Sequence, residues 1–222
     1  MMTSLFSIFD PATPSFILSN WMSLALFTLL VPLFTWIYPN RSSSIVNTMT
    51  GTIFKEFSPL LKKYTNFVIF PVALLTFIFW NNLFGLAPYI FTGTGQMTFT
   101  ASLSLSVWST FMLFTCLNNL PNLLTHLIPQ GTPIPLMPFM VLVETISILI
   151  RPLTLAVRLM ANIVAGHLLI VILNSADIPF GPATPIMFAA KQLLTLLEVA
   201  VAIIQAYVFS VLVTLYAAEA TS

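Results

Sequence analysis

The chain has 222 residues, of which 58% are hydrophobic and only 6% are charged. A soluble globular domain carries about 25% charged residues, so this composition excludes an ordinary water-soluble fold and places most of the exterior in lipid. The net charge of +1 and the single cysteine offer no basic field for nucleic acid, no internal disulfide and no cysteine metal site. We therefore expect neither a cofactor nor a bound metal.

The apolar stretches predict an all-α integral membrane protein, with residues 1–222 forming a single membrane domain. We expect about five membrane-embedded helices and one amphipathic surface helix. Three stretches have about the 20 residues that one crossing needs, and they cover residues 16–38, 67–91 and 98–120. The Thr-Gly-Thr-Gly run at residues 92–95 predicts a turn between the last two.

The surface helix is predicted over residues 45–64, where apolar residues recur at helical spacing. Four of the seven basic residues lie in or beside this segment: Arg41, Lys55, Lys62 and Lys63. The positive-inside rule puts the segment on the side of synthesis, so five crossings place the N-terminus outside and the C-terminus inside. No basic residue precedes Arg41, which argues against a cleavable presequence and favours synthesis inside an organelle or a bacterium.

Two further apolar stretches, residues 136–173 and 183–218, are too long for one upright crossing. As helices they would reach about 57 and 54 Å, against a hydrocarbon thickness of about 30 Å. Either each hides two short spans or each is one tilted helix, and the absence of an internal turn cluster favours the tilted helix. A straight helix would lean roughly 58° from the normal, and a kink at Pro152 would relieve part of this. We expect a steeply tilted helical hairpin.

The ionisable residues within predicted spans are concentrated on this hairpin. Such groups are costly in lipid, so each is a functional candidate. Two sets share a seven-residue spacing, which returns each set to nearly one helix face: Glu144, Arg151 and Arg158 on the first arm, and Lys191, Glu198 and Gln205 on the second. The two polar stripes predict the walls of an ion path.

Arg158 has titratable residues on both sides along its helix, with Glu144 about 21 Å toward the inner surface and His167 about 13 Å toward the outer one. Arginine stays charged and cannot relay protons. At about 4 Å it would stabilise an ionised carboxylate by about 4 kcal/mol at an effective dielectric of 20. A protonated carboxylate passing Arg158 would therefore lose its proton, and the fixed charge would separate an inner from an outer route. Asn162 lies one turn away.

Each of these residues also has a structural interpretation. Arg158 could pair with a structural carboxylate, and Glu144 could be no more than the ion-pair partner of Arg151. The remaining polar side chains could hydrogen-bond or pack between helices: Asn162, His167, Glu198 and Gln205. The position of Lys191 near the outer end favours snorkelling to the interface.

The block around Arg158, residues 155–169 (LAVRLMANIVAGHLL), closely resembles the signature of subunit a, also called subunit 6, of mitochondrial F-type ATP synthases. Further blocks resemble the same family in the same order: residues 82–91, 126–133, 144–147 and 201–209. The resemblance covers most of the chain from about residue 80 onward.

This resemblance implies a non-catalytic, proton-translocating stator subunit in the membrane sector of a rotary ATP synthase. Arg158 would face a ring of small hairpin rotor subunits that bear an essential carboxylate, and it would separate two offset half-channels. Glu198 and His167 would line the outer half-channel, Glu144 would belong to the matrix one, and two amides would neighbour the arginine: Asn162 and Gln205. The family commonly has an uncharged glutamine at the position of Arg151, which is therefore not assigned to the path.

The same resemblance implies a mitochondrial inner-membrane location, with the N-terminus in the intermembrane space, the C-terminus in the matrix, and the gene in the organelle. Partners would be the rotor ring, other stator subunits, lipid and protons. The alternative function is a proton-pumping or antiporter-like membrane subunit of a respiratory complex, which would carry midplane charges on several helices. Confinement of the charges to one hairpin favours the stator.

Overall fold

The computed structural model describes residues 9–13, 19–25, 40–61, 65–87, 90–118, 120–128, 133–175 and 184–221. In these ranges every regular element is a helix, which confirms the all-α prediction. Four of the described helices are long and apolar enough to cross a membrane: Asn66–Gly85, Met97–Asn118, Met137–Ser175 and Thr184–Ala220. The predicted span over residues 16–38 lies largely outside the described residues, which include there only residues 19–25, with the 3-10 helix η2 (Asn20–Ala25).

The surface segment forms helix α2 (Arg41–Phe57), earlier in both its start and its end than the predicted range of 45–64. Its start is set by Asn40, whose side-chain oxygen accepts a hydrogen bond from the Arg41 backbone N–H at 2.7 Å. Phe57 at its last turn is buried against the rest of the protein, whereas Ile45 and Met49 are exposed. The helix is therefore anchored at its C-terminal end.

Helix α3 (Ile69–Gly85), which follows the 3-10 turn η3 (Thr65–Val68), packs on α7 (Thr184–Thr221). Helix α4 (Met97–Asn118) packs on α6 (Met137–Ser175) and also touches α7. Two short helices, α5 (Leu120–His126) and η5 (Ile134–Leu136), lie between α4 and α6 in the chain. The main core combines side chains from these four long helices: Ile78, Val107, Leu155, Leu159, Ala206, Phe209 and Val213.

Small side chains let α6 and α7 approach their neighbours closely. Ala156, Ala202 and Ala206 are all buried. Lipid tails are as apolar as the side chains, so moving a side chain from lipid into a helix interface gives little hydrophobic free energy. Helix association in a membrane therefore depends on close van der Waals packing and on polar contacts between helices. The polar contacts that join α6 to α7 are therefore informative about what the hairpin does.

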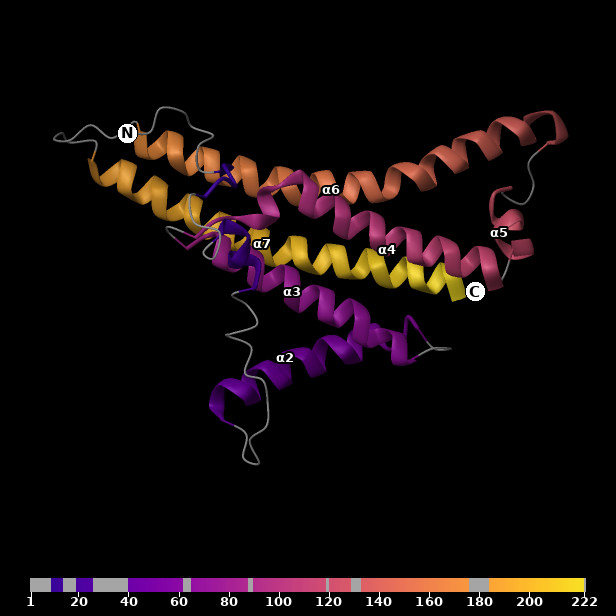
Figure 1. Ribbon diagram of the computed structural model, residues 1–222, viewed down its shortest axis with the longest axis horizontal. Helices are drawn as coiled ribbons and strands as arrows, with labels where there is room; N and C mark the ends of the chain where they lie inside the picture. Colours follow the sequence, from indigo (N-terminus) through magenta and orange to yellow (C-terminus); the bar gives the residue numbers. More distant parts are fainter. Residues whose placement is uncertain are drawn as a thin grey trace.

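Helices α6 and α7 contain 39 and 38 residues and are each continuous, which confirms two long helices and excludes two short spans with a turn in each. Figure 1 shows that α6 bends about halfway along its length, and Pro152 lies inside the helix. Proline removes one backbone hydrogen bond and clashes with the preceding turn, which accounts for a bend. The tilt of the hairpin in the bilayer stays a prediction.

The predicted turn after α3 is the 3-10 helix η4 (Gly93–Gly95), which packs against α6 and α3. Its residues are buried, and a Cβ added to Gly93 would lie 2.5 Å from the side chain of Leu24. No larger residue fits there without displacing Leu24. The glycines thus let this turn lie close to the side chains of Leu24 and Phe9.

Candidate functional site

Arg158 lies on an outward face of α6. Leu155 and Leu159 on the same two turns are buried in the core, whereas Arg158 and Val157 are exposed. No hydrogen bond or ion pair joins Arg158 to another residue in the described part of the chain. The guanidinium is therefore presented to whatever lies outside this face, and a structural partner within the described chain is not what holds it.

Asn162 and Gln205 connect α6 to α7 one turn from Arg158. The Asn162 side-chain amide donates a hydrogen bond to the Gln205 Oε1 atom at 2.9 Å. Gln205 is 4% exposed, and its own Nε2 group has no hydrogen-bond partner among the described residues. The contact thus satisfies the Gln205 amide oxygen and leaves the buried Gln205 Nε2 donor without a partner among the described residues.

Glu198 on α7 lies against the backbone of α6 at Gly166. A Cβ added to Gly166 would be 2.8 Å from the Glu198 Oε1 atom, so the absence of a side chain makes room for the carboxylate. Glu198 is only 7% exposed, and neither of its oxygens has a hydrogen-bond partner within the described ranges. His167, the next residue along α6, likewise has a buried Nε2 atom with no described partner. We call Gly166, His167 and Glu198 the Glu198 site.

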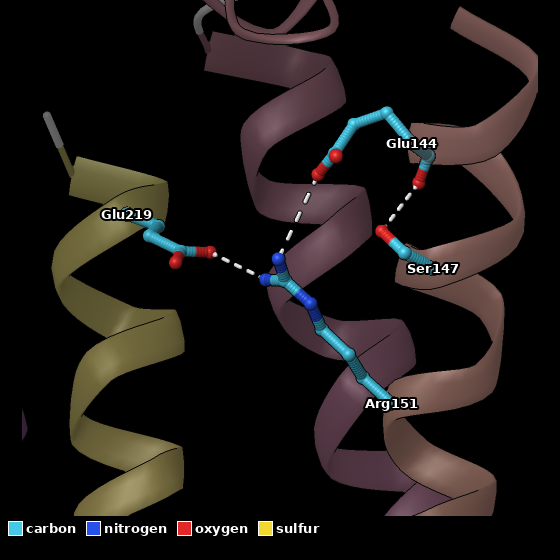
Figure 2. A network of polar contacts seen from close by, with 4 residues as sticks. All are labelled: Glu144, Ser147, Arg151 and Glu219. Carbon is cyan, nitrogen blue, oxygen red and sulfur yellow. Dashed lines mark hydrogen bonds and ion pairs between the residues drawn. The ribbon is translucent and has the colours of Figure 1, made fainter. Parts of the chain in front are cut away.

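Glu144 lies in the other half of α6 and is paired. Arg151 contacts Glu144 at 3.7 Å and Glu219 on α7 at 3.2 Å. Figure 2 shows both carboxylates directed at the two ends of one guanidinium. We call these three residues the Arg151 bridge. The ion pair between Glu144 and Arg151 that their spacing allows is thus present, and Glu144 is not an isolated carboxylate.

Comparison with known proteins identifies the family. Residues 17–218 match the family model described as ATP synthase A chain. Similar curated proteins named ATP synthase subunit a come from Locusta migratoria, Anopheles quadrimaculatus and Drosophila mauritiana, at 49%, 46% and 45% identity over 99% of this chain and 99% of each relative. The chain belongs to the ATP synthase A chain family. This confirms the resemblance inferred from the block around Arg158.

Membership of the ATP synthase A chain family also confirms the expected function. The chain is a proton-translocating stator subunit of the membrane sector of an ATP synthase, and no observation favours a respiratory-complex subunit. Four long apolar helices among the described residues fit a multi-pass membrane protein. In the same ranges no group of three or more His, Cys, Asp or Glu side chains is arranged to hold a metal.

The structure adds buried polar residues on α3 and around η4, which packs against α6, that sequence reasoning did not assign to the path. Asn82 on α3 and Thr92 and Thr94 around η4 are buried, and their side-chain polar atoms have no hydrogen-bond partner among the described residues. Phe9 connects the end of η4 to α6. Its backbone carbonyl accepts a hydrogen bond from the Gln96 side chain, and its ring packs edge-on against the His167 ring, with 6.3 Å between the ring centroids. An asparagine inside an apolar span was the available signal for Asn82. No sequence signal showed that the η4 turn packs against α6.

Proposed function

We propose that Arg158 faces the rotor ring of the ATP synthase and forces an essential ring carboxylate to release its proton there. The observation that carries this proposal is the exposed Arg158 side chain, which has no ion pair within the described chain. A charge in a spanning helix is costly unless a partner compensates it. A carboxylate on a neighbouring subunit supplies that compensation at the moment when it must ionise.

The Glu198 site then belongs to the outer half-channel. Burying a carboxylate without a partner is unfavourable, so the two unpaired Glu198 oxygens are atoms at which water or a proton is held. The unpaired His167 Nε2 atom lies on the residue next to Gly166 and offers a second position. Further unsatisfied polar atoms lie at Thr92 and Thr94 around η4, which packs against α6, and at Asn82 on α3. Protons taken up through the outer half-channel neutralise the ring carboxylate, which can then face lipid.

Glu144 then belongs to the matrix half-channel, on the opposite side of Arg158 along α6. The two half-channels are offset, so a proton reaches the second only after the ring has turned, and this constraint produces torque. Asn162 and Gln205 are the polar neighbours of Arg158 between them, supported by their mutual hydrogen bond. The subunit itself is non-catalytic, and ATP is made elsewhere in the complex.

The proposed setting is the mitochondrial inner membrane, which agrees with insect relatives named ATP synthase subunit a. The basic residues near α2 support an N-terminus in the intermembrane space and a C-terminus in the matrix. An organelle gene is part of the same proposal, as the resemblance to mitochondrial subunit a implies. The rotor ring and the other stator subunits are the proposed protein partners.

The test is substitution of Arg158 in the assembled enzyme. Arg158→Ala removes the charge, and Arg158→Lys replaces a rigid planar fork with a point charge on a flexible stem. We expect both to lower proton-driven ATP synthesis by about a hundredfold or more, since a preorganised charge is removed or misplaced, while the complex still assembles. Arg41→Gln, which removes the same kind of charge from the exposed start of α2, should leave synthesis unchanged. Parent-like synthesis in either Arg158 variant would contradict the proposal.

A further inference from the structure

Arg151 makes contacts on two helices at once (Figure 2). Its Nη2 atom lies 3.7 Å from the Glu144 Oε1 atom two turns earlier on α6, and its Nη1 atom lies 3.2 Å from the Glu219 Oε2 atom in the last turn of α7. The guanidinium also stands over the ring of Tyr216 on α7, with its central carbon 5.9 Å from the ring centroid. Three side chains from two helices thus converge on one cation.

The chemistry of this bridge suits arginine better than lysine or glutamine. The guanidinium is planar and permanently charged, and its separate N–H groups can bind two carboxylates in different directions while its face lies on an aromatic ring. A lysine offers one compact charge, and a glutamine offers none. Neither could hold Glu144 and Glu219 in the observed positions together.

The bridge also sits where α6 and α7 would otherwise be least connected. Three polar or close contacts follow one another along the antiparallel hairpin: Gly166 with Glu198, Asn162 with Gln205, and Arg151 with Glu219. Helix α4 packs on both α6 and α7. In Figure 1 the two long helices separate toward the C-terminal end of α7, with α4 between them. Arg151 therefore joins α6 to α7 in the part of the hairpin where the two helix backbones lie farther apart.

We propose that Arg151 is a positioning residue for the inner part of the proton path. It places the Glu144 carboxylate toward α7 and ties it to the last turn of that helix, so that the inner half-channel keeps its geometry while the ring moves past Arg158. Arg151 lies about 10.5 Å along α6 from Arg158. It is close enough to belong to the same proton path, but too far away to take the place of Arg158 beside the ring carboxylate. This inference rests on the proposed function of α6 and α7.

The charged groups of the bridge are accessible at the surface of the subunit, and among the described residues one of them alone orients the Glu144 carboxylate. Arg151 is 36% exposed and Glu219 is 66% exposed on their side chains, so both groups lie at the surface of the subunit. The Ser147 hydroxyl, one turn from Glu144 in Figure 2, donates to the Glu144 backbone carbonyl at 2.8 Å and does not hold its carboxylate. Within the described chain, Arg151 is the residue that fixes where this carboxylate lies.

The experiment measures passive proton conductance of the assembled membrane sector in vesicles, with assembly quantified separately. We expect Arg151→Gln and Glu219→Gln each to lower conductance about three- to tenfold, the range expected for coupled contacts, with assembly unchanged. The double variant should lie within about twofold of the lower single variant, because both remove one bridge. Arg151→Lys should restore part of the loss. Ser147→Ala is the matched control and should conduct like the parent.

Two results would overturn the inference: parent-like conductance of Arg151→Gln, or losses in Arg151→Gln and Glu219→Gln that multiply in the double variant. If Arg151→Gln assembles poorly, the Arg151→Lys and Glu219→Gln variants decide, and parent-like conductance in both would overturn it. Arg158→Ala, measured alongside, separates the two proposals. If Arg158→Ala blocks ATP synthesis while Arg151→Gln conducts protons like the parent, only the proposed role of Arg151 is rejected. If Arg158→Ala still supports normal ATP synthesis, the proposed function itself is rejected.

Discussion

The carboxylates of the Glu198 site and those of the Arg151 bridge lie in opposite environments within the long hairpin. At the Glu198 site the acid is buried, lies against the backbone of Gly166, and has no hydrogen-bond partner among the described residues. At the Arg151 bridge two acids are partly exposed and share one guanidinium. The two groups are on opposite sides of Arg158 along α6.

This difference separates two tasks. A carboxylate with an arginine against it is held in place, because the fixed charge stabilises one ionised geometry. A buried carboxylate without such a partner is free to exchange a proton with a mobile donor. We therefore propose proton exchange at the Glu198 site and positioning at the Arg151 bridge.

Among changes at the two compared sites, and below the loss expected for the Arg158 variants, the largest effect should come from removing the Glu198 carboxylate. We expect Glu198→Gln to slow proton uptake from the outer side and to lower ATP synthesis by about tenfold or more, as loss of an acid–base group does. Because uptake then limits the rate, synthesis should depend more steeply on outer pH and rise as that pH falls. Initial rates at several outer pH values measure this. Glu56→Gln, an exposed acid on α2, is the control, and an unchanged pH profile for Glu198→Gln would make Glu198 structural.

A smaller effect should follow from filling the space beside Glu198. The added methyl of Gly166→Ala would displace a carboxylate that lies 2.8 Å from its position, and we expect synthesis to fall about three- to tenfold, within the range for coupled neighbours. Gly51→Ala is the matched control, because nothing lies within 4 Å of a Cβ there. Shortening the acid in Gly166→Ala/Glu198→Asp should recover part of the rate. A Gly166→Ala enzyme with parent-like synthesis would show that the carboxylate position is not critical.

The smallest effect should come from the hydrogen bond that joins α6 to α7 between the two compared sites. Asn162→Ala removes the 2.9 Å hydrogen bond to Gln205, and contacts of this kind contribute about 0.6 to 1.7 kcal/mol in membranes. We expect a lower thermal stability of the membrane sector and less than about a twofold change in synthesis. Thermal unfolding of the isolated sector measures the first. A loss of synthesis as large as that of Glu198→Gln would instead place Asn162 in the proton path itself.

Sequence reasoning was most successful where periodicity and length decide the outcome. The two long helices, the turn at η4 and the helix of the surface segment follow from apolar runs and their breaks, and the structure contains all of them. It was less successful where a partner comes from elsewhere in the chain. The seven-residue spacing allowed an ion pair between Arg151 and Glu144, yet Glu219 was not expected to complete the bridge, because it lies 68 residues from Arg151.

The sequence by itself determined that this protein lives in lipid, that its charges gather on two long helices, and that Arg158 lies in a highly specific family block. These properties depend on composition, spacing and local pattern, which are all visible along one chain. Only the tertiary structure decided that Glu198 lies against Gly166, that Arg151 joins two helices, and that Arg158 is exposed. Those outcomes depend on helix register and on the space left by small residues, and both arise when the helices pack together.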